Sequence, residues 1–252
     1  MRFASLGSGS RGNGTLVQSG STLLLVDCGF SVRETERRMA RLGVSAADLD
    51  AVLVTHEHSD HCSGVAPLSR KYQLPVYLTR GTHASGRCDK PWEVCYFHSE
   101  APFQLGDVRV EPIAVPHDAR EPCQFVFQSH GFRLGILTDL GSVTPAVLAH
   151  YRACHGLLLE CNHDLEMLHV GPYPPSLKRR VGGDWGHLNN RQSAALLQEV
   201  HHELMQQVVI AHISEQNNHR ERVEDALCAV FPHRDRLTWA DQELGFDWLE
   251  LA

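Results

Sequence analysis

Residues Val54–Gly64 read VTHEHSDHCSG and place three histidines and an aspartate in the six positions from His56 to His61. The cluster follows an apolar run, and His56 and His58 stand two apart, the spacing that puts side chains on one side of an extended chain. Histidines that bind zinc from a helix stand four apart instead. We therefore expect the cluster to begin at a strand end, where imidazole and carboxylate groups could converge on a metal ion.

Chance is a poor explanation for this pattern. With 17 histidines in 252 residues, an H-x-H-x-D-H match arises by chance in about 0.4% of such chains. The alternative interpretation, a polar loop in a histidine-rich protein, is therefore disfavoured.

Length and composition bound the class of protein. With 252 residues and 42% hydrophobic content, we expect one domain, residues 1–252, around one large core. The net charge of -7 provides no general attraction for nucleic acid or membranes, so a polyanion would need a local site. We find no apolar run of about 18 residues and no signal peptide in MRFASLGSGS, and we predict a cytoplasmic protein. The eight cysteines form no C-x-x-C pair and are predicted to be mostly buried thiols.

Strands and helices alternate loosely in both halves of the chain. We expect strands at 2–6, 15–18, 22–26, 49–55, 75–79, 108–116, 123–129, 132–139, 156–161 and 207–213. We expect helices at 32–42, 62–72, 144–154, 190–204 and 221–231. Each amphipathic helix must bury its apolar stripe on a sheet, so this order predicts an α/β protein with two sheets face to face and helices outside.

Further ligand-type residues follow other apolar strands. His117 lies in AVPHD, Asp139 in LTDLG and His212 in VIAHIS. A carboxylate such as Asp139 has two oxygens and can bind two ions, which a neutral histidine cannot do. A site for two metal ions is therefore the favoured interpretation.

These motifs together resemble the metallo-β-lactamase-fold hydrolases over the whole chain. The resemblance implies an αββα four-layer sandwich and two divalent metal ions. It implies that the first ion is held by His56, His58 and His117, and the second by Asp60, His61 and His212, with Asp139 bridging the two. Asp27, which ends LLLVD, matches an aspartate that supports the site from behind in that family. The histidine-rich first site favours Zn²⁺, and Mn²⁺ is the alternative because two carboxylates contribute.

The resemblance is strongest to the compact YycJ (WalJ) subgroup. It rests on GSGSRGN, THEHSDH, ECNHD, GPYPPSLKRRV, GHLNN and AHISEQNN. Asp139 stands where β-lactamases of the fold have cysteine or no bridging residue, which disfavours antibiotic hydrolysis. The interval from Asp139 to His212 is also too short for the inserted domain of the long nucleases. The subgroup implies 5′ to 3′ exonuclease activity on DNA.

Several polar residues are candidates for substrate contacts. Ser10 and Asn13 lie in a glycine-rich loop, which could equally be an ordinary hairpin turn. Asn162 and His163 follow a strand end. His187 in GHLNN is expected to open a helix, whose free N–H groups would favour phosphate; the alternative is a simple capping role for Asn189 or Asn190.

One basic run, Lys178, Arg179 and Arg180, stands out in this acidic chain. It could hold a nucleic-acid backbone, with Tyr173 stacking on a base, or it could be a solvated surface loop. DNA is favoured over RNA as the partner, and no membrane partner is expected.

The favoured function is a dimetal phosphodiesterase in which a metal-bridging hydroxide attacks phosphorus. Catalytic candidates are Asp60, His187 and His163, and the sequence leaves open whether His187 or His163 protonates the leaving oxygen. The alternative is a small-molecule hydrolase of the same fold, acting on a cyclic phosphate or a thioester. A non-catalytic metal-binding scaffold is disfavoured by the complete ligand set, and the oligomeric state is left open.

Overall fold

The computed structural model describes residues 1–252, which form two seven-stranded sheets. The first sheet contains, in spatial order, β14 (Phe246–Glu250), β1 (Arg2–Gly7), β2 (Gly14–Ser19), β3 (Thr22–Val26), β4 (Ala51–Leu53), β5 (Pro75–Leu78) and β6 (Glu93–Tyr96). The second contains β13 (Leu237–Trp239), β12 (Gln207–Ala211), β11 (Gly156–Glu160), β10 (Phe132–Leu137), β9 (Cys123–Ser129), β8 (Val108–Ala114) and β7 (Phe103–Leu105).

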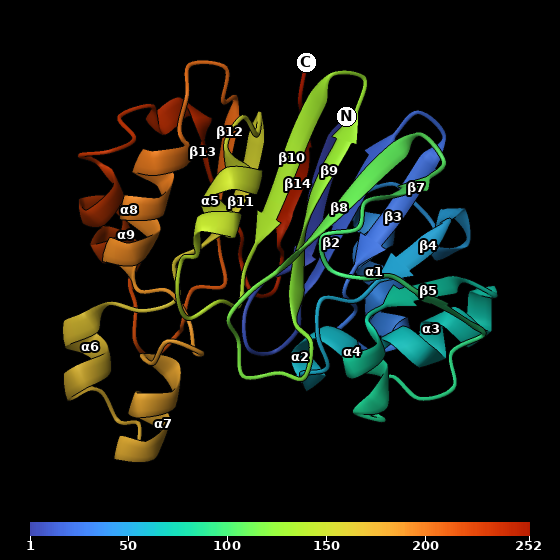
Figure 1. Cartoon of the computed structure of the whole chain (residues 1–252), viewed down its shortest axis with the longest axis horizontal. Coiled ribbons are helices and arrows are strands. Elements are labelled where there is room, and N and C mark those ends of the chain that lie inside the picture. The colour runs from blue at the N-terminus through green and yellow to red at the C-terminus, as the bar shows by residue number, and fades with distance from the viewer.

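Helices cover the outer face of each sheet, as Figure 1 shows. The first sheet is covered by α1 (Val32–Arg41) and α3 (Val65–Tyr72), and the second by α5 (Pro145–Tyr151), α8 (Asn190–Val200) and α9 (Arg220–Leu227). Four short helices lie toward the lower edge in that view: α2 (Ser59–Cys62), α4 (Arg80–Ala84), α6 (Leu165–Val170) and α7 (Pro175–Val181). Two 3-10 turns complete the elements, η1 (Ala46–Asp48) and η2 (Arg234–Arg236). None of these helices has the length and apolar character needed to cross a bilayer.

Three apolar clusters hold the layers together. The cluster between the sheets joins residues such as Phe3 and Leu24 of the first sheet to Phe125 and Leu158 of the second. The other two clusters lie between each sheet and its helices. Strands covered on both faces read as continuous apolar runs, and all five residues of β11 are accordingly buried. The predicted αββα sandwich is confirmed.

The direction of the strands brings the candidate ligands together. Strands β3 and β4 run parallel in the first sheet, and β10, β11 and β12 run parallel in the second. Parallel strands present their carboxyl ends at one edge of a sheet, and residues that follow them share that edge. Asp27 follows β3, His56 follows β4, and Asp139 and His212 follow β10 and β12. Both sheets therefore direct their candidate ligands to the same edge.

Some elements differ from the sequence prediction. The helix predicted at 62–72 begins only at Val65, after Gly64 as its N-cap, and Cys62 instead ends the separate helix α2. Only glycine fits at position 64, because a Cβ there would lie 1.9 Å from the carbonyl oxygen of Phe30. The helix predicted at 190–204 ends at Val200, where the next residue turns to extended backbone. The unassigned segment 236–251 supplies an edge strand to each sheet, β13 and β14.

The sequence prediction also missed short elements between the larger ones. It had no α4, β6 or β7, and it treated the stretch that holds α6 and α7 as a loop. Lys178, Arg179 and Arg180 therefore lie on a helix, α7, and not on a loop. The presence of this helix does not test the alternative of a solvated surface without a binding role. That helix buries no residue, so it has no apolar stripe from which a helix could be predicted.

The cysteines give a first testable prediction. All eight are free thiols, and six of them are buried. Because no disulfide restricts the unfolded chain, adding a reducing agent should leave the melting temperature nearly unchanged. Thermal unfolding followed by circular dichroism, with and without reductant, measures this. A fall of many degrees in reductant would reveal a structural disulfide and contradict the prediction.

Candidate metal centre and its cleft

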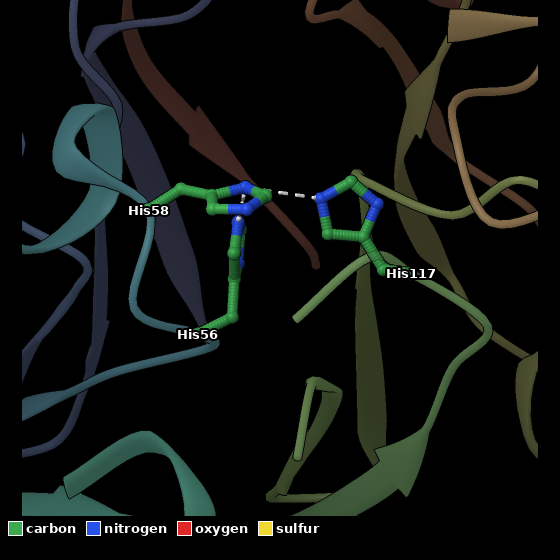
Figure 2. A group of neighbouring side chains, drawn as sticks. All are labelled: His56, His58 and His117. Carbon is green, nitrogen blue, oxygen red and sulfur yellow. Dashed lines mark hydrogen bonds between the residues drawn. The ribbon is translucent and has the colours of Figure 1, made fainter. Parts of the chain in front are cut away.

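Three histidine rings converge from two loops, as Figure 2 shows. His56 Nε2 lies 3.0 Å from His58 Nδ1, and His117 Nε2 lies 3.2 Å from the same atom. Burial lowers the pKa of His56 well below its usual value and also lowers that of His117. These two rings are therefore neutral and offer lone pairs. Three imidazole nitrogens within 4.8 Å of one another fit one divalent ion such as Zn²⁺.

A second group of ligand atoms surrounds Asp139, which is 2% exposed. Asp139 Oδ2 lies 3.0 Å from His212 Nδ1 and 3.3 Å from His61 Nε2. Asp60 Oδ2 lies 3.5 Å from the same nitrogen of His61. Ligand atoms of His56, His61 and Asp139 also lie within 4.8 Å of one another, so Asp139 stands between the two groups.

The electrostatics of this second group suit a cation. Burial alone would lower the pKa of His61, but the carboxylates of Asp139, Asp27 and Asp60 raise it well above the usual value. Burial opposes ionisation of Asp139 too, yet His212 and His61 hold its pKa well below the usual value. Buried carboxylates at this density need a positive partner, and a divalent ion would provide one.

Asp27 supports the site from behind. Its Oδ2 lies 2.8 Å from His61 Nδ1, and its Oδ1 accepts the backbone N–H of Thr55 at 2.8 Å. The hydroxyl of Thr55 donates to Asp27 and lies 2.9 Å from His56 Nδ1. One buried carboxylate thus fixes the rings of His61 and His56, leaving the Nε2 atom of each to face the centre.

Three residues of the site adopt backbone that favours glycine. Asp27 has φ of 60°, Asp139 of 55° and His212 of 51°. For a residue other than glycine, left-handed backbone costs of order 1 kcal/mol of conformational free energy or more. Such a conformation is kept only where the surrounding structure holds the residue in it. All three lie just after strands, so the strand ends turn sharply to point these side chains at the centre.

The centre opens into a cleft of ≈440 Å³. Its lining includes nine residues that the sequence prediction named: the proposed ligands His58, Asp60, Asp139 and His212, the proposed substrate contacts Ser10, Asn162, Tyr173 and Arg180, and the catalytic candidate His187. The cleft is within the usual size range for ligand sites.

Eight predicted residues lie outside that lining: the proposed ligands His56, His61 and His117, Asp27 behind them, and Asn13, His163, Lys178 and Arg179. Asn13 is buried and its side-chain nitrogen lies 3.0 Å from His61 Nε2, so it contacts a candidate ligand rather than open cleft. His163 is fully buried, neither ring nitrogen has a partner, and burial lowers its pKa to about 4. Lys178 donates to the carbonyl oxygen of His169, and Arg179 does not line the cleft.

Arg180 is the member of the basic run that reaches the cleft. Its guanidinium is hydrogen-bonded to the carboxylate of Asp118, the residue after His117. Asp118 Oδ1 lies 3.6 Å from His58 Nε2 and 3.5 Å from His117 Nε2. Burial would raise the pKa of Asp118, but Arg180 and His117 lower it. Helix α7 is thereby held against the loop that carries a candidate ligand.

His187 is held by a carboxylate that the sequence analysis missed. Its Nδ1 lies 2.7 Å from Oε1 of Glu160, the last residue of β11, which is fully buried. Burial alone would lower the pKa of His187, but Glu160 raises it to about 9. The sequence did contain a signal for Glu160, because it ends the apolar run GLLLE. Carboxylates are almost never fully buried without a partner, so a buried Glu160 requires one.

The expectation that His187 opens a helix is wrong. Helix α8 is capped by Asn189, whose side chain accepts from the N–H of Gln192 in a capping box. The nearby N–H groups of Leu188 and Asn189 donate to Glu160 and Gln192. These N–H groups are already satisfied, so they are not free to bind phosphate.

Comparison with known proteins identifies the family. The beta-lactamase superfamily domain matches residues 22–213. A protein named exodeoxyribonuclease YycJ, from Bacillus anthracis, is 36% identical over 240 residues, covering 93% of this chain and 90% of that protein. A ribonuclease Z from Methanopyrus kandleri is 43% identical over 106 residues, covering 38% of this chain and 37% of that protein. The solved structure of the metallo-beta-lactamase fold protein YhfI from Bacillus subtilis has a TM-score of 0.77 at 18% identity, covering 98% of both chains.

The chain belongs to the beta-lactamase superfamily. The resemblance inferred from the motifs is confirmed, and with it the class of enzyme, a hydrolase. The cluster of histidine and aspartate side chains fits the divalent metal pair expected for this fold.

Proposed function

We propose that the chain is a dimetal phosphodiesterase acting on nucleic acid, specifically a 5′ to 3′ exonuclease of DNA. The observation that carries the proposal is the position of Asp139 between two groups of ligand atoms, at the base of a cleft that Arg180 and His187 also line. The name of the YycJ relative, an exodeoxyribonuclease, supports DNA as the substrate. The partial match to a ribonuclease Z makes RNA the substrate to test against it.

In this proposal His56, His58 and His117 would hold one ion, and Asp60, His61 and His212 would hold the other, with Asp139 shared between the two. Two divalent ions, when bound there, activate water for attack on phosphorus and offset charge on the phosphoryl oxygens. We favour Zn²⁺ because the first group consists of imidazoles, and Mn²⁺ is the alternative.

Around this centre, we assign His187 as the proton donor to the leaving oxygen. His187 lines the cleft, its Nδ1 lies 3.6 Å from Asp139 Oδ1, and Glu160 favours its protonated form. His163 was the other candidate, and its fully buried ring with a lowered pKa makes it a poorer donor.

Ser10, Asn162 and Arg180 are the proposed substrate contacts within the cleft. The Arg180 guanidinium is available to phosphate if phosphate displaces the Asp118 carboxylate, since arginine forms forked hydrogen bonds with either anion. Lys178 and Arg179, on the same helix, would then contact the backbone beyond the cleft.

Removing the three positive side chains of α7 gives a second prediction. Changing Lys178, Arg179 and Arg180 to alanine should raise the KM for DNA and flatten its dependence on salt, because each lost phosphate contact removes about one unit of slope. Steady-state rates over a salt series measure both effects. The basic-run proposal fails if the triple variant degrades DNA as well as the parent at every salt concentration. A matched control is Arg33→Ala, an exposed arginine of α1.

The proposed function is tested by parallel assays of the metal-supplemented protein. End-labelled DNA, RNA and bis-p-nitrophenyl phosphate are incubated side by side, and the products from each DNA end are resolved with time. Shortening from the 5′ end is the expected result. A protein that degrades no nucleic acid but cleaves a cyclic phosphate or a thioester would replace the proposal with the small-molecule hydrolase.

The cytoplasmic location remains a prediction.

A further inference from the structure

Arg87 is a cation of the cleft wall that the proposed function does not use. It lies in the loop between α4 and β6 and is exposed. The other cation that lines the cleft, Arg180, is already paired with Asp118. Arg87 has no carboxylate within 4.0 Å, so its guanidinium is free to bind an anion that enters the cleft.

The helix that precedes Arg87 is anchored to the loop that carries His117. Glu121 lies four residues after His117, and its Oε2 accepts the backbone N–H of Gly81 in α4 at 2.6 Å. The hydroxyl of Thr79 donates to the carbonyl oxygen of Glu121 at 3.0 Å. The start of α4 is therefore held by the same loop that supplies a candidate ligand.

Aromatic side chains lie exposed farther along this segment. Tyr96, on the edge strand β6, is 43% exposed, and Trp92 is 56% exposed. The guanidinium of Arg80 stacks over the Tyr96 ring, 4.4 Å from its centroid. The Tyr96 hydroxyl lies 2.6 Å from His83 Nδ1, which fixes the orientation of the ring. A fixed, exposed ring beside an arginine is a stacking surface of the kind that binds bases of single strands.

The local charge agrees with this partner. Residues 80–96 contain three cations, Arg80, Arg87 and Lys90, against two carboxylates, Asp89 and Glu93, in a chain whose net charge is -7. Lys90 lies 3.8 Å from Asp89. Arg80 and Arg87 have no carboxylate partner. Phosphate contact by arginine combined with base stacking is typical of single-stranded nucleic acid binding without sequence preference.

We infer that residues 79–97 form a second substrate surface, on which Arg87 binds a phosphate beside the scissile one and Tyr96 and Trp92 stack on bases farther along a single strand. The inference rests on the proposed function and names the form of its substrate. According to this inference, residues 79–97 make the protein bind single-stranded nucleic acid more tightly than single nucleotides.

The test compares variants on single-stranded DNA of increasing length. The variants are Arg87→Ala, the pair Trp92→Ala with Tyr96→Ala, and Tyr96→Phe, which keeps the ring. The control is again Arg33→Ala. Substrates run from a dinucleotide to a strand of about 12 nucleotides, within the usual range of a single-strand site. Binding of the labelled longer strand is measured separately by fluorescence anisotropy in an Asp139→Asn background, so that affinity is read without cleavage.

We expect the KM and the Kd for the longer strand to rise about tenfold in Arg87→Ala and in the double variant, with kcat changed little. The rise should shrink as the strand shortens. Tyr96→Phe, which keeps the ring but loses the contact with His83, should raise the KM and the Kd less than the double variant does, and Arg33→Ala should match the parent. If the parent degrades DNA and every variant matches it at every length, this inference is overturned while the proposed function stands. If the parent neither binds nor degrades nucleic acid, both are overturned.

Discussion

Replacing Asp139 by asparagine is expected to remove one of two bound metal ions and to lower phosphodiester cleavage by at least about a hundredfold. Asp139 Oδ2 lies 3.0 Å from His212 Nδ1 and 3.3 Å from His61 Nε2, so the carboxylate stands between ligands from both sheets. Asparagine has nearly the same shape but lacks the charge and the second ligand oxygen. Metal content per chain after dialysis and turnover of bis-p-nitrophenyl phosphate are the two measurements.

A control separates this effect from a general loss of charge. Asp184 lies in the loop before α8, and its carboxylate is exposed and has no side-chain partner. The control variant Asp184→Asn should therefore keep the metal content and the activity of the parent. The backbone φ of 55° at Asp139 is also one that asparagine tolerates, so the variant should fold. An Asp139→Asn protein with two ions and full turnover would show that Asp139 does not bridge.

The ligand cluster could be predicted because its signal is local. His56, His58 and His61 lie within six consecutive positions, and Asp139 and His212 each follow an apolar strand that is easily recognised. Parallel strands then bring such residues to one edge without any knowledge of side-chain packing. The fold followed from the same apolar runs, since buried strands leave a strong pattern.

The residues that line the cleft could not be predicted as well as the ligands, because they depend on the direction in which each side chain points and on where short helices lie. Asn13 and His163 follow the expected loop and strand end, yet both turn inward and are buried. Arg87 follows the α4 helix that the sequence did not predict, and Arg180 lies on a helix that buries no residue. Contacts that hold short helices of this kind, such as Arg180 with Asp118 for α7 and Gly81 with Glu121 for α4, link residues far apart in the chain.

Glu160 shows why a strong physical signal can still be missed. A strand pattern marks GLLLE as buried but does not reveal which polar group balances its last residue. That partner, His187, lies 27 positions later, beyond two short helices. The pairing raises the pKa of His187, a shift that its own sequence context did not predict.

Replacing His187 by alanine is therefore expected to lower kcat on DNA by about 10²–10⁴-fold while affecting bis-p-nitrophenyl phosphate far less. The alkoxide that leaves from DNA needs a proton, whereas p-nitrophenolate leaves as a stable anion. Glu160→Gln should lose part of the same factor, because it removes the carboxylate that raises the pKa of His187 to about 9. Steady-state kcat on both substrates measures the difference.

The contrast between the substrates carries this test. His130→Asn, in the exposed turn between β9 and β10, is the matched control and should behave as the parent, since asparagine also accepts the φ of 50° found there. Because His187 lies close to Asp139 and His212, metal content must be measured in every variant. An equal loss on both substrates, accompanied by loss of a metal ion, would make His187 a metal ligand. An equal loss with both ions retained would assign His187 to substrate binding, and only the unequal loss supports proton donation to the leaving oxygen.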